Sequence, residues 1–248
     1  MQATSLCVTC PNTHGICGAL LQSSSQELHL QQQPGCRRFR TARAGDQVLT
    51  QNQTSEDVFV LCSGWAFRFF QLPDGRRQIL GFLLPGDLFS LTTVFSGRVR
   101  FSVAALTEIQ FSGFRRPDLL SGRPINVDIA AALAGLCVTA SGAADEMLTV
   151  LGQRSAEERI AYLFLHLMQR LEGQCIIREH RYRLPLRHRH IADAVGLTPV
   201  HVSRVLGHFR SRGIVEFSDG ILQVFDVREL QRIGSLTATE PWALAKPL

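Results

Sequence analysis

Three cysteines near the N-terminus are the residues of this 248-residue sequence whose type and spacing most directly indicate chemistry. Cys7, Cys10 and Cys17 follow a Cys-x2-Cys-x6-Cys pattern in a segment with little hydrophobic periodicity. Thiolates ligate iron–sulfur clusters and zinc, and grouped, accessible thiols oxidise readily. The total of seven cysteines is odd, which argues against a disulfide framework. Iron–sulfur ligation, zinc ligation and thiol oxidation are the open alternatives, beside an arm of unused thiols.

A second group of residues, rich in arginine and histidine, lies toward the C-terminus. Between residues 178 and 212 there are eight arginines against two acidic residues, and five of the chain's eight histidines. The planar guanidinium of arginine pairs with phosphates and with guanine edges through two hydrogen bonds. A GC-rich genome would explain why only Lys246 of the 26 basic residues is a lysine, but it would not explain why acidic residues are scarce between 178 and 212. This segment predicts a nucleic-acid contact, although the net charge of +5 is equally compatible with ordinary solubility.

The sequence around these arginines predicts a helix-turn-helix followed by a wing. Residues 191–195 form a short helix, a turn begins at Gly196, and residues 199–209 form a second helix that Thr198 can cap. Residues 214–225 contain two short strands around an Asp-Gly turn. The expected core between the helices consists of Ile191, Ala194, Val195, Val202, Val205, Leu206 and Phe209. The outward positions are Val200, His201, Ser203, Arg204, Gly207 and His208.

Short apolar runs broken by turn residues dominate the N-terminal half of the sequence. Strands are expected in five of these runs, 57–61, 65–72, 78–84, 101–106 and 109–114. Turn sequences such as Pro73-Asp74-Gly75 separate the runs. Many short strands with glycine and proline turns are typical of an antiparallel barrel or jelly roll.

A long helix is expected next, because residues 125–151 lack proline and follow a helical period. Apolar residues recur at alternating steps of four and three, which is typical of a helix that pairs with a second copy of itself. The predicted dimerisation stripe consists of Ile129, Leu133, Leu136, Ala140, Ala143, Met147 and Val150. The alternative is a helix that packs on its own barrel. Cys137 lies in this helix, and we predict that its side chain is part of the core. Ser155 and Glu158 then form a capping box for the following helix.

The order and spacing of these motifs resemble those of Crp/Fnr transcription regulators over roughly residues 37–232. The resemblance rests on residues 155–160, 191–209 and the wing, and in the barrel on 63–64, 73–79, 81–82 and 85–87. It implies an α+β protein with an antiparallel β-roll like that of cyclic-nucleotide-binding domains, a long dimerisation helix and a C-terminal winged helix-turn-helix. The predicted segments are a Cys-rich arm 1–25, a sensory β-roll 26–122, the dimerisation helix 123–152, the DNA-binding domain 153–235 and a tail 236–248.

The resemblance also implies how DNA is bound. In the family the second helix of the motif enters the major groove, and its Ser-Arg pair corresponds to Ser203 and Arg204. Many members have a glutamate where this chain has Val200, which leaves the half-site open and makes His201 the candidate for a substitute contact. Phosphate contacts are expected from Arg187, Arg189, Arg210 and Arg212, each with a solvated surface charge as the alternative. The implied partners are a second copy, a palindromic DNA duplex and RNA polymerase.

Family members sense different signals through the β-roll, and cyclic nucleotide is disfavoured here. No glutamate lies between Asp87 and Glu108 to hold a ribose, and Phe101 follows Arg100 where the phosphate cradle has a serine. A buried phosphate without its full set of donors would be costly.

The cysteine arm instead resembles that of Fnr-type sensors, which implies a [4Fe–4S] cofactor on Cys7, Cys10 and Cys17. The fourth cysteine of those sensors has no counterpart in residues 107–114, where Ser112 stands near its position. We assign Cys62 as the fourth ligand, with Cys36 as the alternative and His14 or a carboxylate also open. Cys175 lies beyond the sensory segment and is interpreted as structural or incidental.

Other classes of protein are disfavoured by what the sequence lacks. It has no P-loop, no G-x-G-x-x-G and no H-E-x-x-H pattern, so we do not expect an enzyme. It also has neither an apolar run of about 18 residues nor a secretory signal, so we expect a cytoplasmic protein without a membrane partner. A constitutive DNA-binding protein with a degenerate barrel remains an alternative, and it would show no signal-dependent change in DNA affinity.

Overall fold

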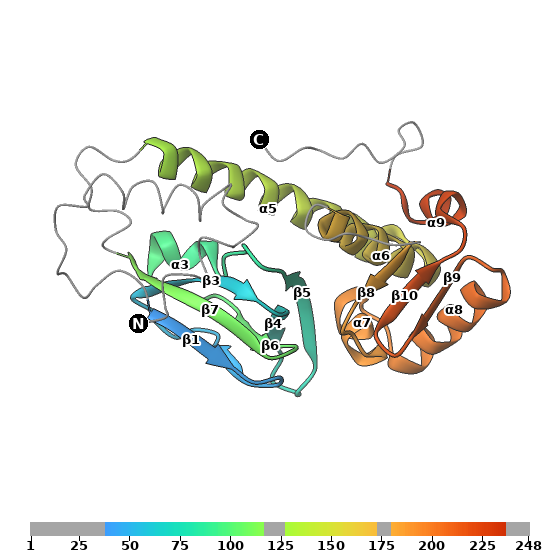
Figure 1. Cartoon of the computed structure of the whole chain (residues 1–248), viewed down its shortest axis with the longest axis horizontal. Helices are drawn as coiled ribbons and strands as arrows, with labels where there is room; N and C mark the ends of the chain where they lie inside the picture. The colour runs from blue at the N-terminus through green and yellow to red at the C-terminus, as the bar shows by residue number, and fades with distance from the viewer. Residues whose placement is uncertain (1–37, 117–126, 173–179, 237–248) are drawn as a thin grey trace. The chain divides into compact units, whose positions relative to one another are not determined.

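The computed structural model describes residues 38–116, 127–172 and 180–236, so the cysteine arm lies outside the described residues. The chain divides into two compact units between Ser141 and Gly142, within helix α5 (Val127–Gln153). Strands dominate the first unit and helices the second, which confirms the predicted α+β class (Figure 1).

Two antiparallel sheets build the first unit. One sheet has the order β1-β7-β3, with β1 at Arg38–Ala42, β7 at Ile109–Arg115 and β3 at Asp57–Ser63. The other has the order β2-β6-β4-β5, formed by Gln47–Leu49, Ser102–Ala105, Ala66–Gln71 and Arg77–Leu83. All five predicted apolar runs contain strands, and the predicted tight turn joins β4 to β5. The short helix α3 (Leu91–Ser96) precedes β6.

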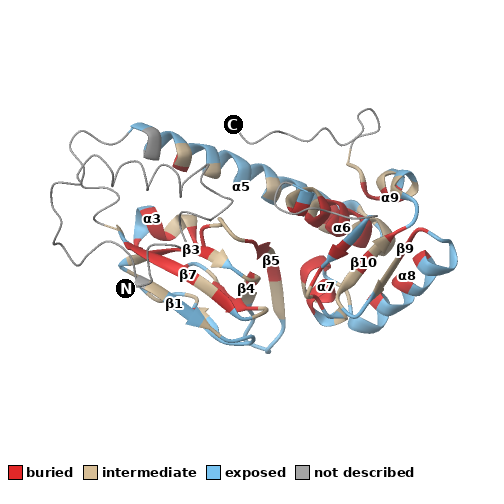
Figure 2. Ribbon diagram, viewed as in Figure 1, coloured by how far each residue is buried: buried red, intermediate tan, exposed pale blue. Residues whose placement is uncertain are grey.

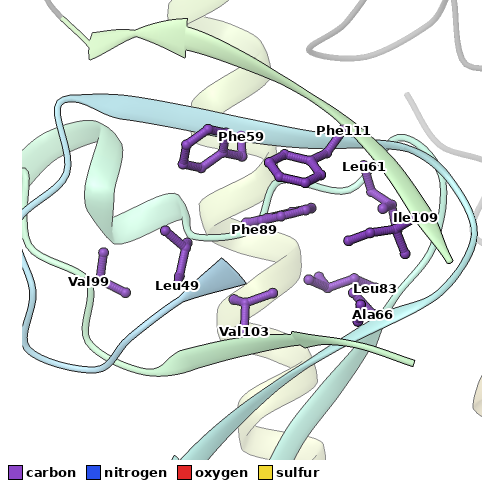
Figure 3. Packing of buried hydrophobic residues seen from close by; sticks show 11 residues of the cluster. Leu49, Phe59, Leu61, Ala66, Leu83, Phe89, Val99, Val103, Ile109 and Phe111 are labelled. Atoms are coloured by element: carbon purple, nitrogen blue, oxygen red, sulfur yellow. The ribbon is translucent and has the colours of Figure 1, made fainter. Parts of the chain in front are cut away.

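Aromatic side chains fill the space between these sheets. The ring of Phe111 lies edge-on to Phe59, with centroids 5.5 Å apart, and 5.2 Å from Phe89 (Figure 3). The aliphatic members of the cluster are Leu49, Leu61, Ala66, Leu83, Val99, Val103, Ala105 and Ile109. Strands β3, β6 and β7 are buried at most of their positions, which is the reason they stand out in the sequence as short continuous apolar runs.

The first part of α5 packs within its own unit. Leu133 is only 4 % exposed and joins a second apolar cluster with Val58, Val60 and Phe114, and Leu136 packs against the same cluster. This packing agrees with the alternative interpretation of the sequence, a helix packed on its own barrel, for these two members of the predicted stripe. The remaining predicted members differ in environment: Ala140 is exposed, Ala143 and Met147 are half-buried, Val150 is buried, and the side chain of Ile129 lies outside the described residues. Cys137 is exposed, so its predicted core position is wrong.

The second unit contains the C-terminal helices and a small sheet of order β8-β10-β9. Its strands are β8 (Arg181–Arg183), β9 (Val215–Ser218) and β10 (Ile221–Val224). Its other helices are α6 (Ala156–Glu172), α7 (His188–Val195), α8 (Pro199–Ser211) and α9 (Val227–Gly234). Helix α6 is buried along much of its length (Figure 2).

The predicted capping box starts helix α6. The backbone N–H of Ser155 donates to the Glu158 carboxylate at 2.8 Å, and the backbone N–H of Glu158 returns a bond to the Ser155 hydroxyl at 3.4 Å. No helix among the described residues is long and apolar enough to cross a membrane.

Candidate DNA-binding surface

Helices α7 and α8 form the predicted helix-turn-helix. Gly196 ends α7 in a left-handed conformation, with φ of 67°, which glycine adopts without the steric cost of a side chain. The backbone N–H of Leu197 donates to the Ala192 carbonyl at 3.0 Å and closes the turn. The chain then re-enters a helix at Pro199, where the missing amide donor costs nothing.

Thr198 is the N-cap of α8, as predicted. Its hydroxyl oxygen accepts a hydrogen bond from the backbone N–H of His201 at 3.2 Å. The cap satisfies one of the free amide donors at the start of the helix. It thereby fixes the first turn, which carries Val200 and His201.

One face of α8 is buried and the opposite face is exposed. The buried residues are the predicted core positions Val202, Val205, Leu206 and Phe209. All six predicted outward positions are exposed, and Val200 remains 70 % exposed despite its apolar side chain. Because residues three and four apart share a helix face, Val200, Ser203, Arg204 and Gly207 form one stripe along the exposed surface.

The arginines of this region differ in whether they have an acidic partner. Arg210 lies 3.3 Å from Glu216 on β9, and Arg212 donates to Glu229 on α9 at 2.6 Å. Among the described residues, Arg204 forms no hydrogen bond or ion pair. Arg204 is therefore available to an external acceptor, whereas Arg212 already joins α8 to α9 within the unit.

Two further predicted contacts lie at the start of α7. Arg187 and Arg189 are both exposed. The ring of His190 is buried, and its Nδ1 accepts a hydrogen bond from the backbone N–H of Arg187 at 3.1 Å. The Arg189 Nε lies 3.2 Å from the other ring nitrogen of His190. His190 thus holds the first turn of α7 and the backbone of one predicted phosphate contact.

The wing follows α8 as predicted. Strands β9 and β10 pair antiparallel, with Ser218 opposite Ile221. Asp219 and Gly220 between them have φ of 51° and 71°, as a tight hairpin of this handedness requires.

Sequence reasoning missed two residues that position the motif, Arg159 and His190. Arg159 donates through Nε to the Arg154 carbonyl at 2.9 Å and through Nη1 to the Val195 carbonyl at 3.3 Å. It therefore joins the end of α7 to the start of α6. The position of Arg159 as a charged residue beside the apolar face of α6 was the sequence feature that could have identified it. A histidine three residues after an N-cap was the signal for His190.

The predicted metal ligands are only partly described. Cys62 is half-buried on β3, with its Sγ 3.8 Å from the Val60 carbonyl oxygen. Cys7, Cys10, Cys17 and Cys36 lie outside the described residues, as does Cys175. Within the described ranges no three histidine, cysteine or acidic side chains gather in a way that could hold a metal ion.

An exposed, arginine-bearing recognition helix on a helix-turn-helix with a β-wing defines a sequence-reading DNA-binding protein. Residues 158–233 match the Crp-like helix-turn-helix domain, and residues 39–121 match the cyclic nucleotide-binding domain. The second match concerns the β-roll as a fold.

The similarity to known proteins covers most of the chain. The nitrogen fixation regulation protein FixK of Azorhizobium caulinodans is 32 % identical over 169 residues, which cover 68 % of this chain and 67 % of the relative. The transcriptional activator protein FnrL of Cereibacter sphaeroides is 29 % identical, covering 84 % and 83 %. The structure of FixK2 from Bradyrhizobium japonicum superposes with a TM-score of 0.72 at 27 % identity, covering 82 % of this chain and 99 % of that one. The chain belongs to the Crp/Fnr family, as a DNA-binding transcription regulator and not an enzyme.

Proposed function

We propose that this regulator is a homodimer whose DNA binding responds to oxygen or redox state through a [4Fe–4S] cluster. The proposed ligands are Cys7, Cys10, Cys17 and Cys62, because thiolates are the usual protein ligands of such clusters. When bound, the cluster supplies an oxygen-labile centre. The arm cysteines and Cys62 would hold the arm against the β-roll, and loss of this ligation would release it.

The observation that carries the sensory proposal is the position of Cys62. Strand β3 pairs with β7, the strand in which Fnr-type sensors have their fourth cysteine. On β7 itself Ser112 is 2 % exposed and pairs with Val60, two residues before Cys62. A half-buried thiol on the neighbouring strand is therefore accessible, whereas the serine at the family position is not.

Cys36 remains the alternative fourth ligand. It precedes Arg38 by two residues, and Arg38 begins β1, which pairs with the other side of β7. Both candidate thiols therefore belong to strands that flank β7, or to the residues leading into them.

The dimer is supported by an unusual exposed stripe on α5. Val127, Val138 and Leu148 are 78 %, 73 % and 69 % exposed in the single chain. With the exposed residues Ala131, Ala134, Ser141 and Asp145 they repeat at alternating steps of four and three. This is the periodicity of a helix that pairs with a second copy. We therefore propose this stripe, in place of the one chosen from sequence, as the dimer contact.

Regulation then follows from linkage. A dimer places two α8 helices on successive half-sites of a palindrome. If ligation by the four cysteines is tighter in that dimer than in other forms, ligation raises the population that binds DNA. RNA polymerase is the proposed second partner at the promoter, and action on chromosomal DNA would locate the protein in the cytoplasm.

Iron and sulfide analysis of protein purified without oxygen tests the sensory proposal. We expect about four irons per chain and a broad visible band that bleaches in air. Operator affinity should fall as the band bleaches. A colourless protein that contains zinc, or one that binds its operator equally well with and without iron, would contradict the proposal and leave the DNA-binding assignment intact.

Serine variants assign the fourth ligand. Cys62→Ser should lose the band, while Cys36→Ser should retain it. Cys137→Ser is the matched control, because Cys137 is an exposed thiol outside the proposed ligand set. The reverse result for Cys62 and Cys36 would transfer the assignment to Cys36.

We expect no response to cyclic nucleotide. Arg100 is exposed and Phe101 occupies the place of the cradle serine, with the Arg68 guanidinium 5.4 Å from its ring centroid. Titration calorimetry with cyclic AMP should show no binding.

A further inference from the structure

The N-terminal end of α8 presents an apolar side chain to the outside. Val200 is 70 % exposed at the second position of the helix, between Pro199 and His201. This valine is exposed on a surface otherwise rich in arginine and histidine. A contact that removes its apolar side chain from water would be favourable. Its position on the recognition helix suggests where that contact occurs.

Val200 is fixed in place before any partner arrives. The N-cap bond from His201 to Thr198 and the ring of Pro199 restrain the backbone on both sides. As a β-branched residue in a helix, valine has one strongly preferred rotamer. Its two methyl groups are therefore presented in a defined direction.

Val200 shares its helix face with Arg204. Four residues along a helix correspond to an axial rise of about 6 Å, so the two side chains lie one turn apart on the same stripe. That spacing is comparable to one or two base-pair steps of about 3.4 Å. If Arg204 pairs with a guanine, Val200 faces a base within about two pairs of it.

Only one group on a base edge in the major groove matches an apolar side chain, the 5-methyl of thymine. A glutamate at this position would accept a hydrogen bond from the cytosine N4 amino group, which valine cannot do. Valine opposite cytosine would also leave that amino group without an acceptor, and an unsatisfied polar group is penalised.

We infer that Val200 is a specificity-determining residue that reads the methyl group of one thymine in each half-site. The inference rests on the assignment of α8 as the recognition helix. It is independent of the sensory proposal, because any form of the protein that binds DNA can be used.

Removing only the methyl group tests this contact. Full-length protein first selects a duplex from a random pool, and each thymine of one half-site is then replaced in turn by deoxyuridine. We expect one thymine at which the replacement weakens binding about fourfold, the value for one buried methyl group. Val200→Ala should bind the thymine and deoxyuridine duplexes equally well.

Two further variants and one modified base make the outcome specific. Val200→Glu should exchange the thymine preference at that base pair for cytosine. With wild-type protein, 5-methylcytosine should bind better than cytosine there. His201→Ala, which alters the neighbouring exposed residue, should keep the deoxyuridine effect. Val200 is 70 % exposed, so its variants should unfold at the wild-type temperature.

Two results would overturn the inference, and they differ from each other. If replacing each thymine by deoxyuridine changes the affinity of wild type and of Val200→Ala equally, the methyl contact is absent although DNA is bound. If no duplex can be selected at all, the recognition-helix assignment fails, and the inference fails with it.

Discussion

The phenol of Tyr162 on α6 donates a hydrogen bond to the carboxylate of Glu146 on α5, with 2.7 Å between the oxygens. Tyr162 is only 2 % exposed, and burial together with the neighbouring carboxylate raises its pKa well above the ordinary value. The phenol therefore stays protonated and remains a donor at any physiological pH. The bond joins the C-terminal part of α5 to the first helix of the DNA-binding unit.

Loss of this bond should weaken the second unit. Tyr162→Phe removes the hydroxyl but keeps the ring, and we expect a loss of about 1 kcal/mol in the free energy of unfolding. The cost stays moderate because Glu146 is exposed and can be hydrated. Urea unfolding followed by circular dichroism measures it. Glu146→Gln retains an acceptor and should lose less, so equal or greater loss in that variant would argue against the bond.

Gly234 marks the closest approach between α9 and α6. A Cβ added there would lie 2.8 Å from the backbone carbonyl carbon of Ala161 and 2.8 Å from the backbone nitrogen of Tyr162. Because both atoms belong to a buried helix, Gly234→Ala should destabilise the protein by about 1–3 kcal/mol. Gly207→Ala on α8, where nothing lies within 4 Å, should instead stabilise it by about 0.5–1 kcal/mol. Thermal unfolding without DNA compares the two variants.

The helix-turn-helix could be predicted because its signals are local. Gly196, Thr198 and Pro199 each specify backbone geometry within one turn, and the structure has all three in the expected roles. Ion pairs between distant elements could not be predicted in this way. The bond between Arg212 and Glu229 depends on how α8 and α9 pack, and the spacing of these residues in the sequence does not predict it.

The face of α5 that we propose as the dimer contact is a further case where sequence was insufficient. Alternating steps of four and three occur on two opposite faces of this helix, offset by two residues. The face with the larger side chains was chosen, but Leu133 uses its side chain to cover the β-roll. Periodicity identifies an apolar stripe, whereas the neighbour that covers it depends on tertiary packing.

Glutamate substitutions distinguish these two faces. Val138→Glu would bury a charge in the exposed stripe that we propose as the dimer contact. It should raise the dimer dissociation constant by at least a factor of about ten, or about 1.4 kcal/mol. Ala140→Glu lies two positions on, on the other face, and should leave the dimer unchanged. Sedimentation velocity across a concentration series measures both, and dissociation by Ala140→Glu alone would restore the stripe chosen from sequence.

Glu229 should give the second unit a defined response to acid. A hydrogen bond from the Arg232 side chain, aided by the charges of Arg232 and Arg212, lowers the pKa of Glu229 from 4.5 to about 2. A carboxylate with a lowered pKa stabilises the folded state above its unfolded pKa, and this contribution disappears as the pH falls toward the folded value. The melting temperatures of wild type and Glu229→Gln should therefore differ most above pH 4.5 and converge toward pH 2. A constant difference over this range would contradict the ion pair.

Arg204 and Arg210 lie on the same helix but should act differently on DNA. Arg204 has no partner among the described residues and shares its stripe with Val200, so we expect it to read a base. Arg204→Ala should cost about 1–3 kcal/mol of operator binding and relax specificity at one base pair. Arg210 lies 3.3 Å from Glu216, which holds its guanidinium near the wing, where a phosphate contact would position the helix without reading sequence.

Salt dependence separates these two roles. Arg210→Ala should weaken operator and non-specific duplexes alike, and it should reduce the slope of log affinity against log salt by about 1. Arg204→Ala should change the ratio of specific to non-specific affinity far more than it changes that slope. Fluorescence anisotropy at several salt concentrations measures the affinity of each variant for the operator and for the non-specific duplex, together with the salt slopes. Equal loss on both duplexes for Arg204→Ala would mean that Arg204 holds a phosphate, and the base contacts of α8 would then have to come from its other exposed residues.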